Sequence, residues 1–130
     1  MTGVSVSIAS YLCEDIVGLS NFYAEVFDLE EVMDLRSDIF RGLDADGVTI
    51  GFSAPVAYEM LGITDWADAK GTTQYLTFEV GSRTEVEQRT QKALELGATL
   101  LHDIYETYYG AYQSVLSDPA GNVLRINKFD

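Results

Sequence analysis

The sequence has few of the residues that define several familiar classes of protein. Its 130 residues include one cysteine and one histidine, which excludes an intrachain disulfide and a thiolate metal cluster. The single cysteine, Cys13, is expected to be a small buried apolar residue. No apolar run approaches the length of a membrane span, and the first twenty residues lack the basic start of a secretory signal. We therefore expect a soluble, cytoplasmic protein without a membrane partner.

Basic residues are also scarce. The chain has 8 lysines and arginines against 21 aspartates and glutamates, a formal net charge of −13. This charge repels a phosphate backbone, so we predict no nucleic acid partner. An acidic surface either attracts a cationic ligand or only confers solubility, and composition does not separate the two. The length suits one ordinary hydrophobic core, which predicts a single domain over residues 1–130.

The chain repeats itself internally. Residues 44–52 align with residues 118–126 at an offset of 74, because both segments have a turn with Asp and Gly followed by apolar alternation. Upstream, the alternating runs 4–13 and 73–80 each precede an amphipathic helix, at an offset of 67. Repeats of this kind indicate duplicated supersecondary units. We predict an α+β fold of two βαβββ modules, at about 1–54 and 73–130, joined by a connection over 55–72.

Each module has one helix with recognisable signals. Asp15 is placed to cap the first helix, and Ser82 with Glu85 forms a capping-box pattern at the start of the second. Gly97 is placed to end the second helix. The predicted apolar stripes consist of Leu19, Phe22, Tyr23 and Val26 in the first helix and of Val86, Ala93 and Leu94 in the second. Further strands are expected at 29–33, 39–42, 99–101 and 112–116, and a short helix after Pro55.

The stretch SDPAGNVLRI (117–126) reads as a tight turn followed by a strand. Successive strand residues point to opposite faces, so Val123 and Arg125 share one face while Leu124 and Ile126 share the other. An arginine therefore lies on the face opposite the hydrophobic core, where its surroundings bear on function.

Four motifs, in order and at consistent intervals, resemble the vicinal oxygen chelate superfamily of glyoxalases, extradiol dioxygenases, fosfomycin-resistance enzymes and bleomycin-resistance proteins. They are LSNFYAEVFDLEEV (19–32), YLTFEV (75–80), LELGATLL (94–101) and SDPAGNVLRI. The resemblance implies that the two modules form a curved mixed sheet, with a concave ligand cup and helices on the convex side. It also implies a homodimer.

Enzymes of that superfamily hold a divalent metal through one residue at the first and last strand of each module. The motifs carry these four places onto Ile8, Gly51, Tyr75 and Arg125, which do not form a credible ligand set. His102 and Asp103 are adjacent on a predicted strand and face opposite sides, so they make a poor chelate. We predict no bound metal and no other cofactor, which puts metal-dependent chemistry in doubt.

A cup without a metal would act through its side chains. The candidate ligand-binding residues are Ile8, Ser10, Phe52, Trp66, Tyr75, Thr77, Glu79, Tyr108, Tyr109, Gln113 and Arg125. Two alternatives stay open. Arg125 either binds an anionic group or forms an internal salt bridge with Glu79, and the tyrosines over 105–112 form a pocket rim, a dimer contact or core.

Two functions fit this pattern. The first is a metal-independent small-molecule binding protein, similar to the bleomycin-resistance proteins, which takes an aromatic or cationic metabolite or antibiotic. The second is a lyase, isomerase or dioxygenase-like enzyme that uses Glu79 as base, Tyr75 as acid and Arg125 as anion clamp. The vacant ligand quartet favours binding, and the sequence leaves enzymatic activity open.

Overall fold

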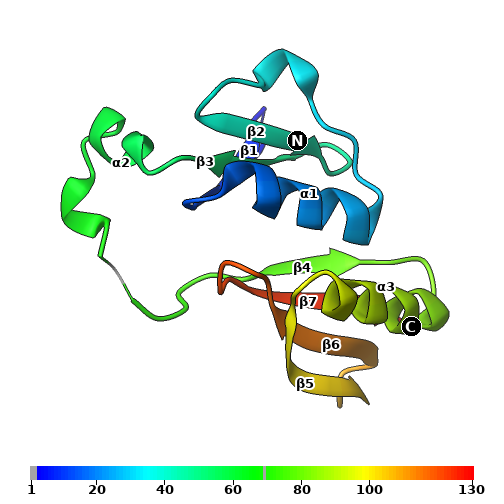
Figure 1. Ribbon diagram of the computed structural model, residues 1–130. Coiled ribbons are helices and arrows are strands. Elements are labelled where there is room, and N and C mark those ends of the chain that lie inside the picture. The colour runs from blue at the N-terminus through cyan, green and yellow to red at the C-terminus, as the bar shows by residue number, and fades with distance from the viewer. Residues whose placement is uncertain (1–2, 69) are drawn as a thin grey trace. The chain divides into compact units, whose positions relative to one another are not determined.

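The computed structural model describes residues 3–68 and 70–130, and the chain forms two compact units, Met1–Ala69 and Lys70–Asp130. Each unit has one mixed sheet with one long helix packed on it (Figure 1). The predicted α+β class and its two modules are therefore confirmed. No helix in the described part of the chain is both long and apolar enough to cross a membrane.

The first unit has a three-stranded sheet in the order β1-β3-β2. Strand β1 runs parallel to β3, and β2 runs antiparallel to β3. The elements are β1 (Ile8–Leu12), α1 (Ile16–Phe27), β2 (Phe40–Asp44), β3 (Thr49–Ser53) and α2 (Val56–Met60), with short 3-10 helices at Met33–Leu35 and Thr64–Trp66. Helix α2 begins directly after Pro55, as the sequence predicts.

The second unit has a four-stranded sheet in the order β4-β7-β6-β5. Strand β4 runs parallel to β7, and the other neighbours are antiparallel. The elements are β4 (Leu76–Glu79), α3 (Arg83–Glu95), β5 (Thr99–Glu106), β6 (Ala111–Ser117) and β7 (Val123–Phe129). In Figure 1 the unit runs from green at β4 to red at β7.

The strand registers reproduce the internal repeat. In the first unit the parallel pair joins Ile8 to Thr49, which are 41 residues apart. In the second unit the parallel pair joins Leu76 to Leu124, which are 48 apart. The difference of 7 equals the difference between the sequence offsets of 74 and 67. The two modules therefore pair their first and last strands in the same register.

Helix α1 begins at the predicted cap, since the Asp15 carboxylate accepts a hydrogen bond of 2.9 Å from the backbone N–H of Gly18. Its predicted stripe is fully confirmed, because all four residues are buried. Tyr23 packs against the rings of Tyr11 and Phe52, with ring centroids 5.8 and 5.7 Å away, and those two rings also contact each other. This aromatic cluster forms the core of the first unit.

Helix α3 covers the apolar face of the second sheet. Ser82 caps it by accepting a hydrogen bond of 3.2 Å from the N–H of Glu85. Val86 and Ala93 are fully buried as predicted, but Leu94 is half-buried. Thr90 is buried in the stripe instead, and its hydroxyl lies 2.7 Å from that of Ser114 on β6. This buried polar pair satisfies both hydroxyls beneath the helix.

Two strand predictions for the first module are wrong. Residues 29–33 form no strand: Glu31 makes an isolated bridge to Leu43, and a 3-10 helix follows. Strand β1 begins at Ile8 and not at Val4, because its partner β3 begins at Thr49, directly after the β2–β3 turn. Strand pairing needs a partner ladder, so the extent of β3 sets the length of β1.

The turn before β7 forms as the sequence predicts. The Asp118 carboxylate accepts hydrogen bonds from the backbone N–H groups of Ala120 and Asn122, at 2.8 and 3.0 Å. Gly121 takes a φ of 93°, which glycine adopts without strain. The turn fixes the start of β7 and therefore the face on which Arg125 lies.

Candidate functional site

The two faces of the second sheet differ in character. Thr77 on β4 and Val115 on β6 both pair with Arg125 on β7, so these three residues share one face. Leu124 and Ile126 are fully buried on the opposite face, which α3 covers. We call the first the polar face. Its members on the strands include Thr77, Glu79, Gln113, Val115, Arg125 and Asn127.

Arg125 is the centre of a hydrogen-bonded cluster on the polar face. Its Nε donates to the Thr77 hydroxyl at 2.9 Å. Its Nη1 donates to the Tyr109 hydroxyl at 3.2 Å and to Gln113 Oε1 at 3.4 Å. The guanidinium carbon lies 5.1 Å from the centre of the Tyr75 ring, within the range of a cation–π contact. All four neighbours are uncharged side chains.

Gln113 is the buried member that holds this cluster together. It is 2% exposed, and its amide donates a hydrogen bond of 2.8 Å to the Tyr105 hydroxyl. Its carbonyl oxygen accepts from both Arg125 and Tyr109. Buried amides are held by such partners because an unpaired polar group in the interior is costly. Gln113 therefore links Tyr105, Tyr109 and Arg125 into one arrangement.

Glu79 belongs to a separate set of contacts. Its Oε1 accepts a hydrogen bond of 2.8 Å from Asn127 Nδ2, and its Oε2 accepts one of 2.7 Å from the backbone N–H of Phe129. Among the described residues Glu79 forms no ion pair with Arg125, so the internal salt bridge left open by the sequence does not form. The carboxylate instead braces the end of β7.

Tyr105 and Asn127 belong to the cluster region but are absent from the predicted ligand-binding residues, although Tyr105 lies in the predicted tyrosine segment 105–112. Asn127 follows Arg125 by two residues, so strand alternation was a sufficient signal. The pairing between β5 and β6 is irregular. Register shifts there place His102 opposite Val115 and Tyr105 opposite Gln113, and the two rings lie 4.0 Å apart between centroids. Bulges disrupt strict alternation, so counting from Thr99 puts His102 on the wrong face, whereas the two shifts cancel at Tyr105.

The remaining predicted tyrosines lie near the β5–β6 turn. Tyr109 is 45% exposed and reaches Arg125 through its hydroxyl. Tyr108 is fully exposed and touches Tyr109 edge to face, with centroids 5.2 Å apart. Tyr112 lies on the helix side, where its hydroxyl donates to Glu87, and this bond raises its pKa above the ordinary value of 10.0. Of Tyr108, Tyr109 and Tyr112, Tyr109 is thus the one that joins the cluster.

The candidate residues of the first unit fall into different places. Ile8 and Ser10 are exposed on the sheet face opposite α1, and Trp66 is exposed in a 3-10 helix. Phe52 is a correction. It points to the α1 side, is completely buried and packs on Tyr11 and Tyr23. Phe52 therefore belongs to the core and not to a ligand-facing surface.

The residues present do not fit a metal of the superfamily type. In the first unit the last-strand position is Gly51, where an added Cβ would lie 2.6 Å from Ser10 Oγ and 2.7 Å from the Phe40 ring. Hence a ligating side chain would fit there only if the side chains of Ser10 and Phe40 moved. In the second unit the equivalent position is Arg125, a permanent cation that repels metal ions. The described residues also contain no group of three His, Cys, Asp or Glu side chains suited to a metal.

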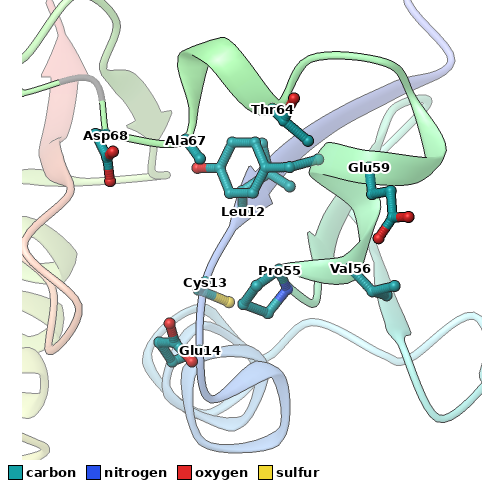
Figure 2. A pocket seen from close by; sticks show the side chains of 10 residues that line it. Leu12, Cys13, Glu14, Pro55, Val56, Glu59, Thr64, Ala67 and Asp68 are labelled. Carbon is teal, nitrogen blue, oxygen red and sulfur yellow. The ribbon is translucent and has the colours of Figure 1, made fainter.

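The first unit contains a pocket of about 470 Å³ beside α2 (Figure 2). Leu12, Pro55 and Val56 give it apolar walls, and the carboxylates of Glu14, Glu59 and Asp68 lie around it. All three carboxylates are exposed, so water and salt screen their field. The negative charge around this pocket therefore does not distinguish it from the rest of the acidic surface. The polar face of the second unit is the stronger candidate for ligand binding.

Comparison with known proteins gives the family. Residues 5–127 match the Glyoxalase-like domain family, nearly the whole chain. The chain belongs to this family. The solved structure of a glyoxalase/bleomycin resistance protein/dioxygenase family enzyme from Burkholderia phytofirmans PsJN is 40% identical, with a TM-score of 0.95, over 98% of this chain and 100% of that one. The resemblance to the vicinal oxygen chelate superfamily is therefore confirmed.

More distant structures share the fold of this glyoxalase-like domain. A glyoxalase-related enzyme from Fulvimarina pelagi is 20% identical, with a TM-score of 0.81, over 95% of this chain and 87% of that one. Lactoylglutathione lyase from Agrobacterium tumefaciens is 18% identical, with a TM-score of 0.70, over 98% and 96%. At these identities the likeness shows the fold alone. No curated protein matches the chain.

Proposed function

We propose that this glyoxalase-like domain is a metal-independent binding protein for a small aromatic molecule, which it holds on the polar face of its second unit. The observation that carries the proposal is the Arg125 cluster. A fixed guanidinium, an exposed Tyr75 ring and three neutral hydrogen-bonding side chains converge on one face. A few convergent polar groups beside aromatic surface are typical of small-molecule sites.

Binding is a better account of this face than catalysis. A general base, a general acid and an anion clamp have to converge on one substrate position. Both oxygens of Glu79, the candidate base, already accept hydrogen bonds from β7. Tyr75, the candidate acid, contributes the face of its ring to Arg125. Among the described residues Glu79 makes no hydrogen bond or ion pair with Tyr75 or Arg125, which favours binding over acid–base chemistry on this face.

Thermal unfolding with a panel of aromatic anions, neutral aromatic compounds and aromatic amines tests the proposal. A compound that binds the native state raises the unfolding midpoint as its concentration rises. We expect such a rise in protein pretreated with a chelator, and the compound should be recovered unchanged by mass spectrometry. Stabilisation that needs an added metal, or conversion of the compound, would contradict the proposal, as would a panel without any stabilising compound.

Arg125→Gln and Arg89→Gln form a matched pair for this test. Arg89 is in the same unit but on α3, where it pairs with Glu85 at 3.2 Å. Loss of stabilisation in Arg125→Gln, with retention in Arg89→Gln, would place binding on the polar face. An equal loss in both variants would point to a general effect of charge.

A further inference from the structure

The arginines of the chain differ in how their charge is neutralised. Arg36 and Arg41 approach Glu31, Arg83 pairs with Glu106 and Asp130, and Arg89 pairs with Glu85. Arg125 alone of the five has no carboxylate within ion-pair distance among the residues that the structure describes. In a chain with 21 acidic residues, one arginine keeps its positive charge uncompensated.

The hydrogen bonds of Arg125 leave one edge of the guanidinium available. Nε donates to Thr77, and Nη1 donates to Tyr109 and Gln113. Nη2 has no acceptor among the described residues, so its two N–H groups are open to a ligand. The two Nη1 bonds, at 3.2 and 3.4 Å, are longer than a typical charge-assisted bond. An anionic oxygen would therefore compete well for this edge.

The neighbours of the guanidinium orient it without cancelling its charge. Gln113 accepts a hydrogen bond from Arg125 through its side-chain carbonyl oxygen. A glutamate could accept the same bond, but the glutamine carries no charge. Thr77 and Tyr109 likewise offer neutral oxygens. A glutamate at position 113 would form a buried ion pair with Arg125 and neutralise its charge within the protein. The choice of neutral acceptors therefore preserves a site for an external anion.

An aromatic surface adjoins this cation. Tyr75 is 51% exposed and Tyr109 is 45% exposed, so part of each ring is accessible. Offset stacking on such a ring adds about 0.5–1.5 kcal/mol to the burial of apolar area. The site thus offers a charged hydrogen-bond donor and a flat apolar surface side by side.

We infer that the ligand of the Arg125 site is a small aromatic oxyanion, with an aromatic carboxylate as the simplest example. This inference rests on the proposed function and names the class of ligand. The guanidinium provides the positive charge at a position where related enzymes would hold a metal ligand, and an oxygen of the ligand binds at Nη2. The ring of the ligand stacks on the exposed tyrosine surface. Of the aromatic or cationic ligands that the sequence suggested, the site thus favours an aromatic one that carries a negative charge.

The net charge of −13 opposes this preference at long range. At physiological ionic strength, however, the screening length is about 8 Å, and exposed charges beyond it have little effect. The direct contact at Arg125 is within hydrogen-bonding distance and is not screened in this way. The contact therefore decides the sign of the ligand, and raising the salt concentration should weaken the long-range repulsion first.

Side-chain NMR of the arginines, with benzoate, benzamide and benzylamine as probes, tests the inference. The three probes share a ring and differ in charge. We expect saturable shifts of the Arg125 Nε signal with benzoate and about tenfold or more weaker binding of benzamide, because hydrogen bonds to charged groups are the stronger ones. Arg83 and Arg36, which are already paired, serve as internal controls and should not move.

The variant Gln113→Glu supplies the second arm. A carboxylate at this position should pair with Arg125 and reduce benzoate binding at least tenfold. If the buried change unfolds the protein, the comparison of benzoate with benzamide in the wild type still decides the question. Equal or tighter binding of benzamide or benzylamine would overturn the inference while leaving the binding function intact. An Arg125 signal that does not respond to benzoate at any accessible concentration would also overturn it.

Discussion

Thr77 and Arg125 lie directly opposite each other in the parallel pair of β4 and β7, and the Thr77 hydroxyl accepts a hydrogen bond of 2.9 Å from Arg125 Nε. The equivalent pair in the first unit is Ser10 and Gly51. At this position of the last strand, the second module has the guanidinium of Arg125, and the first module has Gly51, which has no side chain. The two modules therefore differ at the position to which the proposed function assigns ligand binding.

Thr77→Val tests the role of this pair. The substitution keeps the shape of the side chain but removes the hydroxyl that orients Nε. We expect benzoate to bind roughly three- to tenfold more weakly, since the loss of one orienting hydrogen bond, worth about 1 kcal/mol, loosens the guanidinium without removing it. Isothermal titration would measure this, with the exposed helix variant Thr84→Val as control. Affinities that agree within twofold would show that Thr77 does not position Arg125.

Glu79→Gln separates structural support from catalysis. The carboxylate accepts two hydrogen bonds from β7, so the variant should lose roughly 1 kcal/mol of unfolding free energy in urea denaturation. Because Glu79 does not pair with Arg125, benzoate affinity should change by less than about twofold. A large gain in anion affinity would instead reveal a Glu79–Arg125 interaction, in conflict with the structure.

Phe52→Ala tests the placement of Phe52 in the core. Its ring is fully buried between Tyr11 and Tyr23. Deleting a buried phenylalanine ring removes transfer free energy and leaves a cavity, so stability should fall by about 3–5 kcal/mol. Chemical denaturation measures this loss. The exposed variant Trp66→Ala is the control and should change stability by less than about 0.5 kcal/mol. A similarly small effect of Phe52→Ala would contradict its assignment to the core.

The pH dependence of Glu31 provides a local electrostatic test. Two hydrogen bonds from Arg36, at 2.8 and 2.6 Å, hold the pKa of Glu31 below its ordinary value of 4.5. A folded-state pKa below the unfolded value stabilises the fold above that unfolded value, and the contribution disappears as the pH falls through the lowered pKa. NMR titration should give a midpoint below 4.5 in the wild type. Arg36→Gln should raise it, and an unchanged midpoint would refute the pairing.

Much of the fold follows from local signals in the sequence. The Asp15 and Ser82 caps and the α1 stripe depend on neighbouring residues, and they form as predicted. The internal offsets even anticipate the register of the parallel strands. Features that depend on residues far away in the sequence could not be predicted from such local signals. Residues 29–33 have strand-like composition but find one isolated bridge in place of a ladder.

The site shows the same division. Strand alternation placed Thr77 and Arg125 on one face, because β4 and β7 pair without bulges. It could not place His102, since the irregular β5–β6 pairing sets this residue opposite Val115. Nor could the sequence choose between Glu79 and an external anion as the partner of Arg125. That choice depends on the hydrogen bonds that draw Glu79 to Asn127 and Phe129.

The most direct test of the account is the dissociation constant of benzoate, measured by isothermal titration before and after chelator treatment in the wild type and in Arg125→Gln. The account predicts one constant for the wild type in both states and at least tenfold weaker binding in the variant, because the guanidinium is the binding cation. Binding that disappears with the chelator and returns with a metal, or a variant that binds as well as the wild type, would contradict it.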